Sequence, residues 1–167
     1  MSRILDQAIK LSYPKGTDKK KYAYKGGKPT KAFKDALNKV FPKRSGWSSA
    51  PKKGASCDVA VATVVRSSGV AKKYPRGRSE QRKYKSDKFK RIVKKNARPI
   101  DYAKAGDVVI YDRTKGGKKG HTFIFGGNCI YEAKNNKNAS KRSYFHCNRN
   151  LKKMRKKYPK VIILREK

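Results

Sequence analysis

The chain has 167 residues, enough to bury one hydrophobic core but short for two, so we expect a single folded unit. It carries 47 lysines and arginines against 11 acids, for a formal net charge of +36, and because these residues are spread along the whole sequence we expect a positive surface on every side. No segment has the length and apolarity to cross a bilayer, and the first residues lack the apolar stretch of a secretory signal, which argues against a membrane anchor and predicts a chain made in the cytoplasm.

Two helices are predicted in the first 45 residues. Residues 4–11 carry apolar side chains at helical spacing. After Thr30, a residue type that often caps helices, apolar residues recur three and four positions apart until Pro42 ends the pattern. These elements predict a helical N-terminal segment.

A third helix is predicted at 57–69, "CDVAVATVVRSSG". The β-branched content of this stretch is typical of a strand, but its apolar residues share one helical face. Ser56 is suited to cap the start, Asp58 to the positive end of the helix dipole and Gly69 to the stop. We therefore favour a helix over a strand.

The second half of the chain predicts a sheet. A short helix is expected from about Ser86, with Phe89, Ile92 and Val93 on its inner face. Five short β-branched or aromatic runs then alternate with Gly, Asn or Lys clusters, at 106–112, 121–125, 128–133, 143–147 and 161–165. Helices followed by strands indicate an α+β fold, with the helix at 57–69 packed on a five-stranded antiparallel sheet.

One hairpin within this sheet unites a histidine and an acid. In "GKKGHTFIFGGNCIYEA", a turn at Gly126 and Gly127 would place His121 directly opposite Glu132. A turn shifted by one residue, to Gly127 and Asn128, would place them one diagonal apart on the same face. Either register gives the arrangement in which a carboxylate orients a histidine base and stabilises its protonated form.

A surface ion pair is the alternative interpretation of this contact. His121, however, begins a strand whose same face continues with Phe123, Phe125 and Ile130, which we expect in the core. The sequence therefore predicts a base at the rim of a buried surface.

Cys57 is the candidate nucleophile for such a base. A thiol in the first turn of a helix faces unpaired backbone N–H groups and the positive end of the dipole, so we expect a lowered pKa and a thiolate near neutral pH. The backbone N–H of Cys57 is itself a candidate oxyanion donor. The alternative is a small buried hydrophobic residue, and for Cys129 and Cys147 we adopt that interpretation. His146 beside Cys147 is weak evidence for zinc, so we expect no metal and no cofactor.

The ordered segments "GWSSAPKKGASCDVAVATVVRSSG" and "AKAGDVVIYDRTKGGKKGHTFIFGGNCIYEA" resemble the NlpC-type papain-like cell-wall cysteine peptidases and their CHAP relatives. The match covers roughly residues 46–134. Cys57 corresponds to the nucleophile, Ala105-Gly106-Asp107-Val108 to the first strand, Gly120-His121 to the base and Glu132 to the orienting group. In that family an acid usually precedes the cysteine, whereas here Asp58 follows it.

The resemblance implies a papain-like domain at 46–167, with residues 1–45 as a helical extension packed on it. It also implies hydrolysis of amide bonds in peptidoglycan peptides, without metal or organic cofactor, by a monomer. The implied partner is the anionic bacterial cell wall, with its peptidoglycan and teichoic acids, to which the positive surface would bind. A phage lysis or virion protein, or an effector exported by another route, fits the lack of a secretory signal.

Three alternatives remain for the sequence. A strongly basic nucleic-acid-binding protein without catalysis is favoured by aromatic residues among lysines in "KKKYAYKGGK", "RKYKSDKFKR" and "KKMRKKYPK". An inactive relative kept as a binding module is the second. The third treats the charge alone as an adaptation to salt or a means of solubility.

Overall fold

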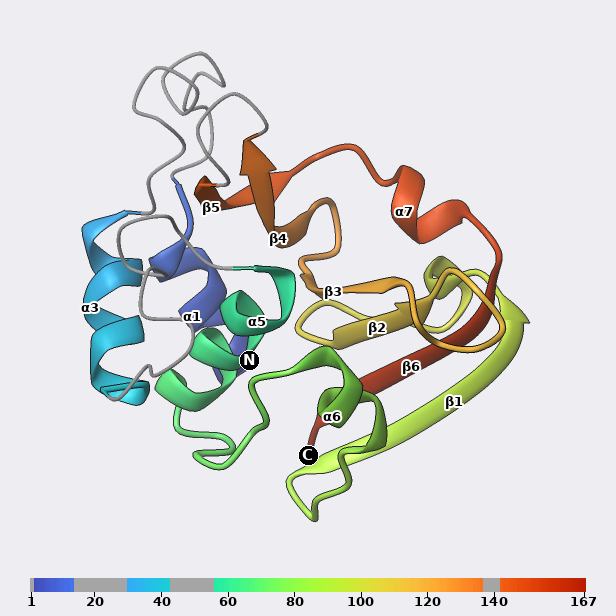
Figure 1. Ribbon diagram of the computed structural model, residues 1–167, viewed down its shortest axis with the longest axis horizontal. Helices are drawn as coiled ribbons and strands as arrows, with labels where there is room; N and C mark the ends of the chain where they lie inside the picture. The colour runs from blue at the N-terminus through green and yellow to red at the C-terminus, as the bar shows by residue number, and fades with distance from the viewer. Residues whose placement is uncertain (1, 14–29, 43–55, 137–141) are drawn as a thin grey trace.

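A computed structural model of the chain describes residues 2–13, 30–42, 56–136 and 142–167. Within these residues the fold is α+β, and its six strands form one antiparallel sheet in the order β1-β6-β2-β3-β4-β5 (Figure 1). No helix in the described ranges has both the length and the apolar character that a membrane span requires.

The three longer predicted helices are confirmed: α1 (Arg3–Leu11), α3 (Lys31–Val40) and α5 (Cys57–Ser67). The Thr30 hydroxyl accepts a hydrogen bond from the Phe33 N–H at 3.1 Å, so Thr30 is the expected N-cap of α3. Helix α5 ends as expected before Gly69, whose φ of +83° is the left-handed conformation that favours glycine.

The five predicted strands are present as β2 (Val108–Asp112), β3 (Gly120–Phe125), β4 (Ile130–Asn136), β5 (Arg142–Asn148) and β6 (Tyr158–Glu166). The sheet nevertheless has a sixth strand, β1 (Phe89–Ala97), at its edge. The prediction of five strands was therefore one short.

The predicted helix from Ser86 is wrong, because this segment forms β1. The Ser86 carbonyl accepts a hydrogen bond from the backbone N–H of Phe89 in a turn, and the residues from Phe89 to Ala97, except Asn96, pair with β6. The short helix of this region lies earlier, as α6 (Arg78–Lys83). Pairing with a distant strand has outweighed a weak local helical pattern.

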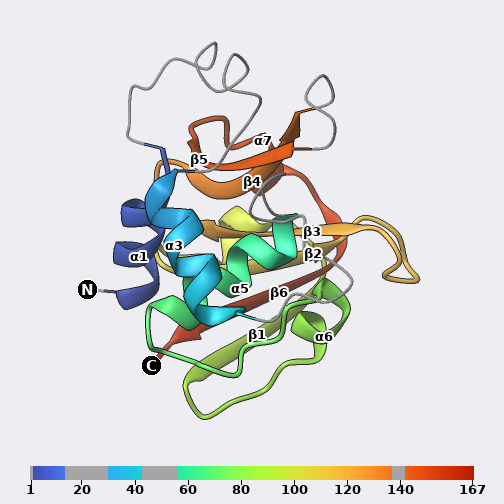
Figure 2. The ribbon, with the colours of Figure 1, turned by 60° about the vertical axis from the view of Figure 1, so that its left-hand side comes forward.

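Helices cover one face of the sheet. Figure 2 shows α1 and α3 against α5, and α5 against the sheet. Their buried side chains form one cluster with residues of the sheet that includes Ile4, Phe33, Val61, Ile110 and Ile124. The opposite face carries a second buried cluster, to which α7 (Lys152–Arg155) contributes Met154 and against which the 3-10 helix η1 (Pro99–Asp101) packs Ile100.

Candidate active site

The candidate site lies where β4 turns away from β3. The two strands pair only at Ile124 with Tyr131 and at Phe125 with Ile130. The Gly126 N–H donates to the Cys129 carbonyl at 2.8 Å, which defines a turn at Gly127 and Asn128. This is the second of the two registers considered from the sequence. Helix α5 begins beside the point where β3 and β4 separate, and it contacts both strands (Figure 1).

The predicted contact between His121 and Glu132 is present, with His121 Nε2 2.6 Å from Glu132 Oε1. Glu132 is 1% exposed and accepts two further hydrogen bonds, from Lys153 Nζ at 2.6 Å and from Asn148 Nδ2 at 2.8 Å. Burial by itself would raise the pKa of Glu132, but the hydrogen bond and charge of His121, helped by Lys153, lower it to about 2. The carboxylate is therefore ionised over the whole neutral range.

Aromatic rings fix the other side of the imidazole. Tyr111 meets His121 edge-on with ring centroids 5.9 Å apart, and Tyr111 in turn stacks on Tyr158 at 3.7 Å. Phe123, Phe125 and Ile130 are buried, as expected for the face that continues from His121. His121 itself remains 13% exposed and its ring contacts Tyr111 and Phe123, so it lies at the rim of an apolar cluster.

Cys57 is the first residue of α5, and two backbone N–H groups, those of Asp58 and Thr122, interact with its sulfur. Thr122 directly follows His121 on β3. The structure thus brings the thiol against the backbone of β3, at the residue that follows the candidate base.

The expected low pKa of Cys57 is wrong for the thiol in its surroundings. Burial raises the pKa of Cys57, the Asp58 carboxylate adds to the effect, and the N–H groups of Thr122 and Asp58 together with the charge of Arg78 only partly oppose it. Ser56 does occupy the N-cap position of α5, but its side chain makes no capping bond to the helix and instead hydrogen-bonds to Asp58.

Four residues at this site were not singled out from the sequence: Tyr111, Asn148, Lys153 and Arg78. The first could have been found from the pairing of β2 with β3, which sets Tyr111 opposite His121. The position of Asn148 depends on the register of β4 with β5, and that of Lys153 on the path of the chain into α7. No local pattern in the sequence reports either of them.

The other two cysteines lie away from the base, beside Tyr131. Cys129 is buried, and burial with the neighbouring Cys147 thiol raises the pKa of Cys129 to about 12. Both are free thiols. Among the described residues no group of three or more His, Cys, Asp or Glu side chains is arranged to hold a metal ion.

Comparisons with protein-family models, with curated proteins and with solved structures found no match to this chain.

Proposed function

We propose that the protein is a papain-like cysteine hydrolase that cleaves amide bonds in peptidoglycan peptides. The observation that carries the proposal is the 2.6 Å contact of His121 Nε2 with the buried Glu132, on a strand whose next residue, Thr122, directs its backbone N–H to the Cys57 sulfur at the start of α5. Because Glu132 occupies Nε2, Nδ1 is the ring nitrogen left to exchange a proton with Cys57. The resemblance of the sequence to cell-wall peptidases supplies the substrate class.

In this mechanism the Cys57 sulfur attacks the carbonyl carbon of the amide as its proton passes to His121. The imidazolium then protonates the departing amine, which leaves an acyl group on the sulfur. His121 next takes a proton from water as the oxygen of that water attacks the acyl carbon, the sulfur leaves as a thiolate with release of the carboxylic acid, and the imidazolium returns its proton to the sulfur. The Cys57 N–H, in the first turn of α5, has no carbonyl acceptor within its own helix and is the candidate donor to the oxyanion.

Because the pKa of Cys57 is raised, the proposed mechanism depends more strongly on His121 as the base. A thiol that is neutral at neutral pH needs His121 to remove its proton during attack, and the imidazolium so formed needs the negative charge of Glu132. The carboxylate, buried and ionised, provides that charge without titrating itself.

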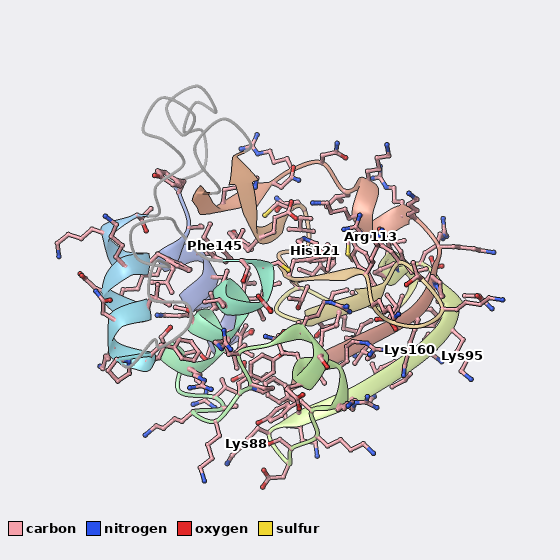
Figure 3. All side chains as sticks on the ribbon, viewed as in Figure 1. Lys88, Lys95, Arg113, His121, Phe145 and Lys160 are labelled. Atoms are coloured by element: carbon pink, nitrogen blue, oxygen red, sulfur yellow. The ribbon has the colours of Figure 1, made fainter. Side chains whose placement is uncertain are left out.

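The positive surface supports an anionic wall as the place of action. Basic side chains extend outward around the outline of the molecule, among them Lys88 and Lys95 (Figure 3). If this charge retains the enzyme on teichoic acid and peptidoglycan, wall binding falls steeply as salt rises, because counterions screen the attraction. Sedimentation of the protein with purified walls at low and high salt measures this, and salt-insensitive binding contradicts it.

The aromatic segments that suggested nucleic-acid stacking do not present free rings where the structure describes them. Tyr158 is 5% exposed and stacks on Tyr111, and Tyr84 and Phe89 pack with the buried Tyr74. The segment at 19–28 lies outside the described residues. These contacts favour the hydrolase over a base-stacking protein.

A zymogram on bacterial walls tests the proposal directly. The wild type should clear the gel, Cys57→Ala should not, and Cys129→Ala should clear it like the wild type because that thiol lies away from the base. Release of new amino groups from purified peptidoglycan then identifies amide cleavage. Clearing that survives Cys57→Ala, or no clearing by the wild type on walls of several chemistries, overturns the assignment.

A further inference from the structure

Two arginines of α6 meet a buried carboxylate at the end of β2. Asp112 is 3% exposed, and its two oxygens accept from Arg78 Nη1 at 3.2 Å and from Arg82 Nη2 at 2.7 Å. Arg78 Nη2 also donates to the Gly117 carbonyl at 2.6 Å. Gly117 lies in the loop from β2 to β3, so these bonds anchor the segment that leads directly to His121.

The glycines of this loop allow the arginines to approach its backbone. A Cβ added to Gly120 would lie 2.7 Å from Arg78 Nη1 and would overlap the Tyr111 carbonyl. Gly117 has a φ of +71°, and a Cβ there would overlap the Arg82 guanidinium. The guanidinium groups thus pack on two of the three glycines of "TKGGKKG", Gly117 and Gly120, whereas a Cβ on Gly116 would meet no other atom of the described residues.

The same helix also holds the residue after the candidate nucleophile. The Arg78 N–H donates to Asp58 Oδ2 at 3.1 Å, and Gln81, which is fully buried, donates from Nε2 to the Asp58 carbonyl at 2.9 Å. Arg78 therefore contacts the first turn of α5 through its backbone and the loop before His121 through its side chain.

The charges of Arg78 and Asp58 act on the thiol in opposite directions. After burial, Asp58 is the largest influence that raises the pKa of Cys57, whereas the charge of Arg78 lowers it. An acid beside a reacting sulfur opposes formation of the thiolate. The Arg78 guanidinium, whose residue hydrogen-bonds to Asp58 through its backbone, favours the thiolate and so offsets the effect of Asp58.

We propose that Arg78 is a positioning residue, which holds the first turn of α5 and the loop before His121 in one arrangement and supplies the positive charge that offsets Asp58 beside the sulfur. The proposal rests on the proposed function, since alignment of sulfur and imidazole matters only if the two react together. A misplacement of about 1 Å between reacting groups costs on the order of 10²-fold in rate.

The test compares Arg78→Gln and Arg78→Lys with Arg165→Ala in the full chain. Arg165 is a matched control, because it pairs with Asp107, a carboxylate as buried as Asp112, through a guanidinium of similar exposure at another part of the sheet. Three quantities are measured: the pH midpoint of iodoacetamide labelling of the Cys57 peptide by mass spectrometry, the rate of amide cleavage, and the urea midpoint of unfolding.

Arg78→Gln should move the labelling midpoint to higher pH and lower the rate on the order of 10²-fold. Arg78→Lys keeps the charge but not the two-pronged contact, so it should keep the midpoint and lose about tenfold in rate. Arg165→Ala should lower the urea midpoint without moving the labelling midpoint. If Arg78→Gln does not fold, Arg78→Lys still decides, because a wild-type rate in that variant overturns the proposal.

An unchanged labelling midpoint in Arg78→Gln, or an equal shift in Arg165→Ala, also overturns the proposal. Labelling needs no substrate, which separates the two claims. A wild type that cleaves no wall but shows a labelling midpoint dependent on Arg78 refutes the proposed function and supports the charge role of Arg78. A wild type that cleaves wall amides, together with a labelling midpoint that does not depend on Arg78, supports the proposed function and refutes the charge role of Arg78.

Discussion

Asp107, just before β2, and Glu132, in β4, are two carboxylates with the same burial and different partners. Asp107 is 2% exposed and accepts from both Nε and Nη2 of Arg165, at 3.0 Å and 2.8 Å, and from the Lys104 N–H at 2.7 Å. Glu132 is 1% exposed and is bonded to an imidazole, an ammonium and an amide. Burial alone does not distinguish a structural acid from a functional one.

The difference lies in whether a partner can exchange a proton. A guanidinium stays charged at every pH at which the protein is folded, so Asp107 serves to close the turn before β2 and to join that strand to β6. An imidazole can accept a proton and give it up again, so the carboxylate that faces it changes the energy of each step of proton transfer. This contrast is the reason why the proposed mechanism uses Glu132 and not Asp107.

The largest expected effect is on the rate of amide cleavage in Glu132→Gln. The amide keeps the shape of the side chain but removes the negative charge that stabilises the imidazolium, so the rate should fall about 10²- to 10⁴-fold. Initial rates of amino-group release from purified peptidoglycan measure it. Asp107→Asn is the matched variant, and its rate per folded molecule should stay within about threefold of the wild type. Equal losses in both variants would remove the distinction between the two acids.

The second effect is a loss of stability, and here the larger change is expected in Asp107→Asn. Asp107→Asn leaves the Arg165 guanidinium without its carboxylate and should lower the free energy of unfolding by about 3 kcal/mol, at the lower end for broken buried pairs because Arg165 keeps some contact with water. Urea unfolding measures the loss. Adding Arg165→Met to Asp107→Asn should recover part of it, since the unpaired charge is then gone. A double variant that is less stable than the single one contradicts this account.

The third effect is the dependence of stability on acid pH. The pKa of Glu132 is about 2 in the folded protein, below its ordinary value of 4.5. Ionisation of Glu132 therefore stabilises the fold fully at pH values above 4.5, and this stabilisation is lost as the pH falls to the folded pKa. The contribution at neutral pH is up to about 3 kcal/mol. The difference in unfolding free energy between wild type and Glu132→Gln should therefore shrink between about pH 5 and pH 2. A difference that stays constant over this range would mean that the pKa is not depressed.

Local patterns predicted the elements whose stability is local. Helices α1, α3 and α5 have apolar faces and end signals within their own residues, such as Thr30 and Gly69. The approach of His121 to Glu132 also followed from local geometry, because two adjacent glycines restricted the hairpin to two registers and both united the pair.

Elements that depend on distant partners escaped prediction. Strand β1 has an apolar pattern compatible with a short helix, and only its pairing with β6, near the other end of the chain, decides for a strand. Likewise, Asn148 and Lys153 reach Glu132 from β5 and from α7, by way of a connection whose length does not fix a register. The pKa of Cys57 was mistaken because burial and the charge of Asp58 are properties of packing, which a helix-start argument omits.

The smallest effect separates the members of the Glu132 cluster from one another. Lys153 shares Oε1 of Glu132 with His121 but is 41% exposed, so its removal should change little in stability. In Lys153→Met the positive charge that partly neutralises the Glu132 carboxylate is gone, so the carboxylate stabilises the imidazolium more strongly. Iodoacetamide labelling of Cys57 near neutral pH should then become about two- to fivefold faster. Lys152→Met, at an exposed neighbour, should leave the labelling rate unchanged. Slower labelling in Lys153→Met would show that Lys153 acts mainly by holding the Glu132 side chain in place. The argument that its charge weakens the effect of the carboxylate on the imidazole would then fail.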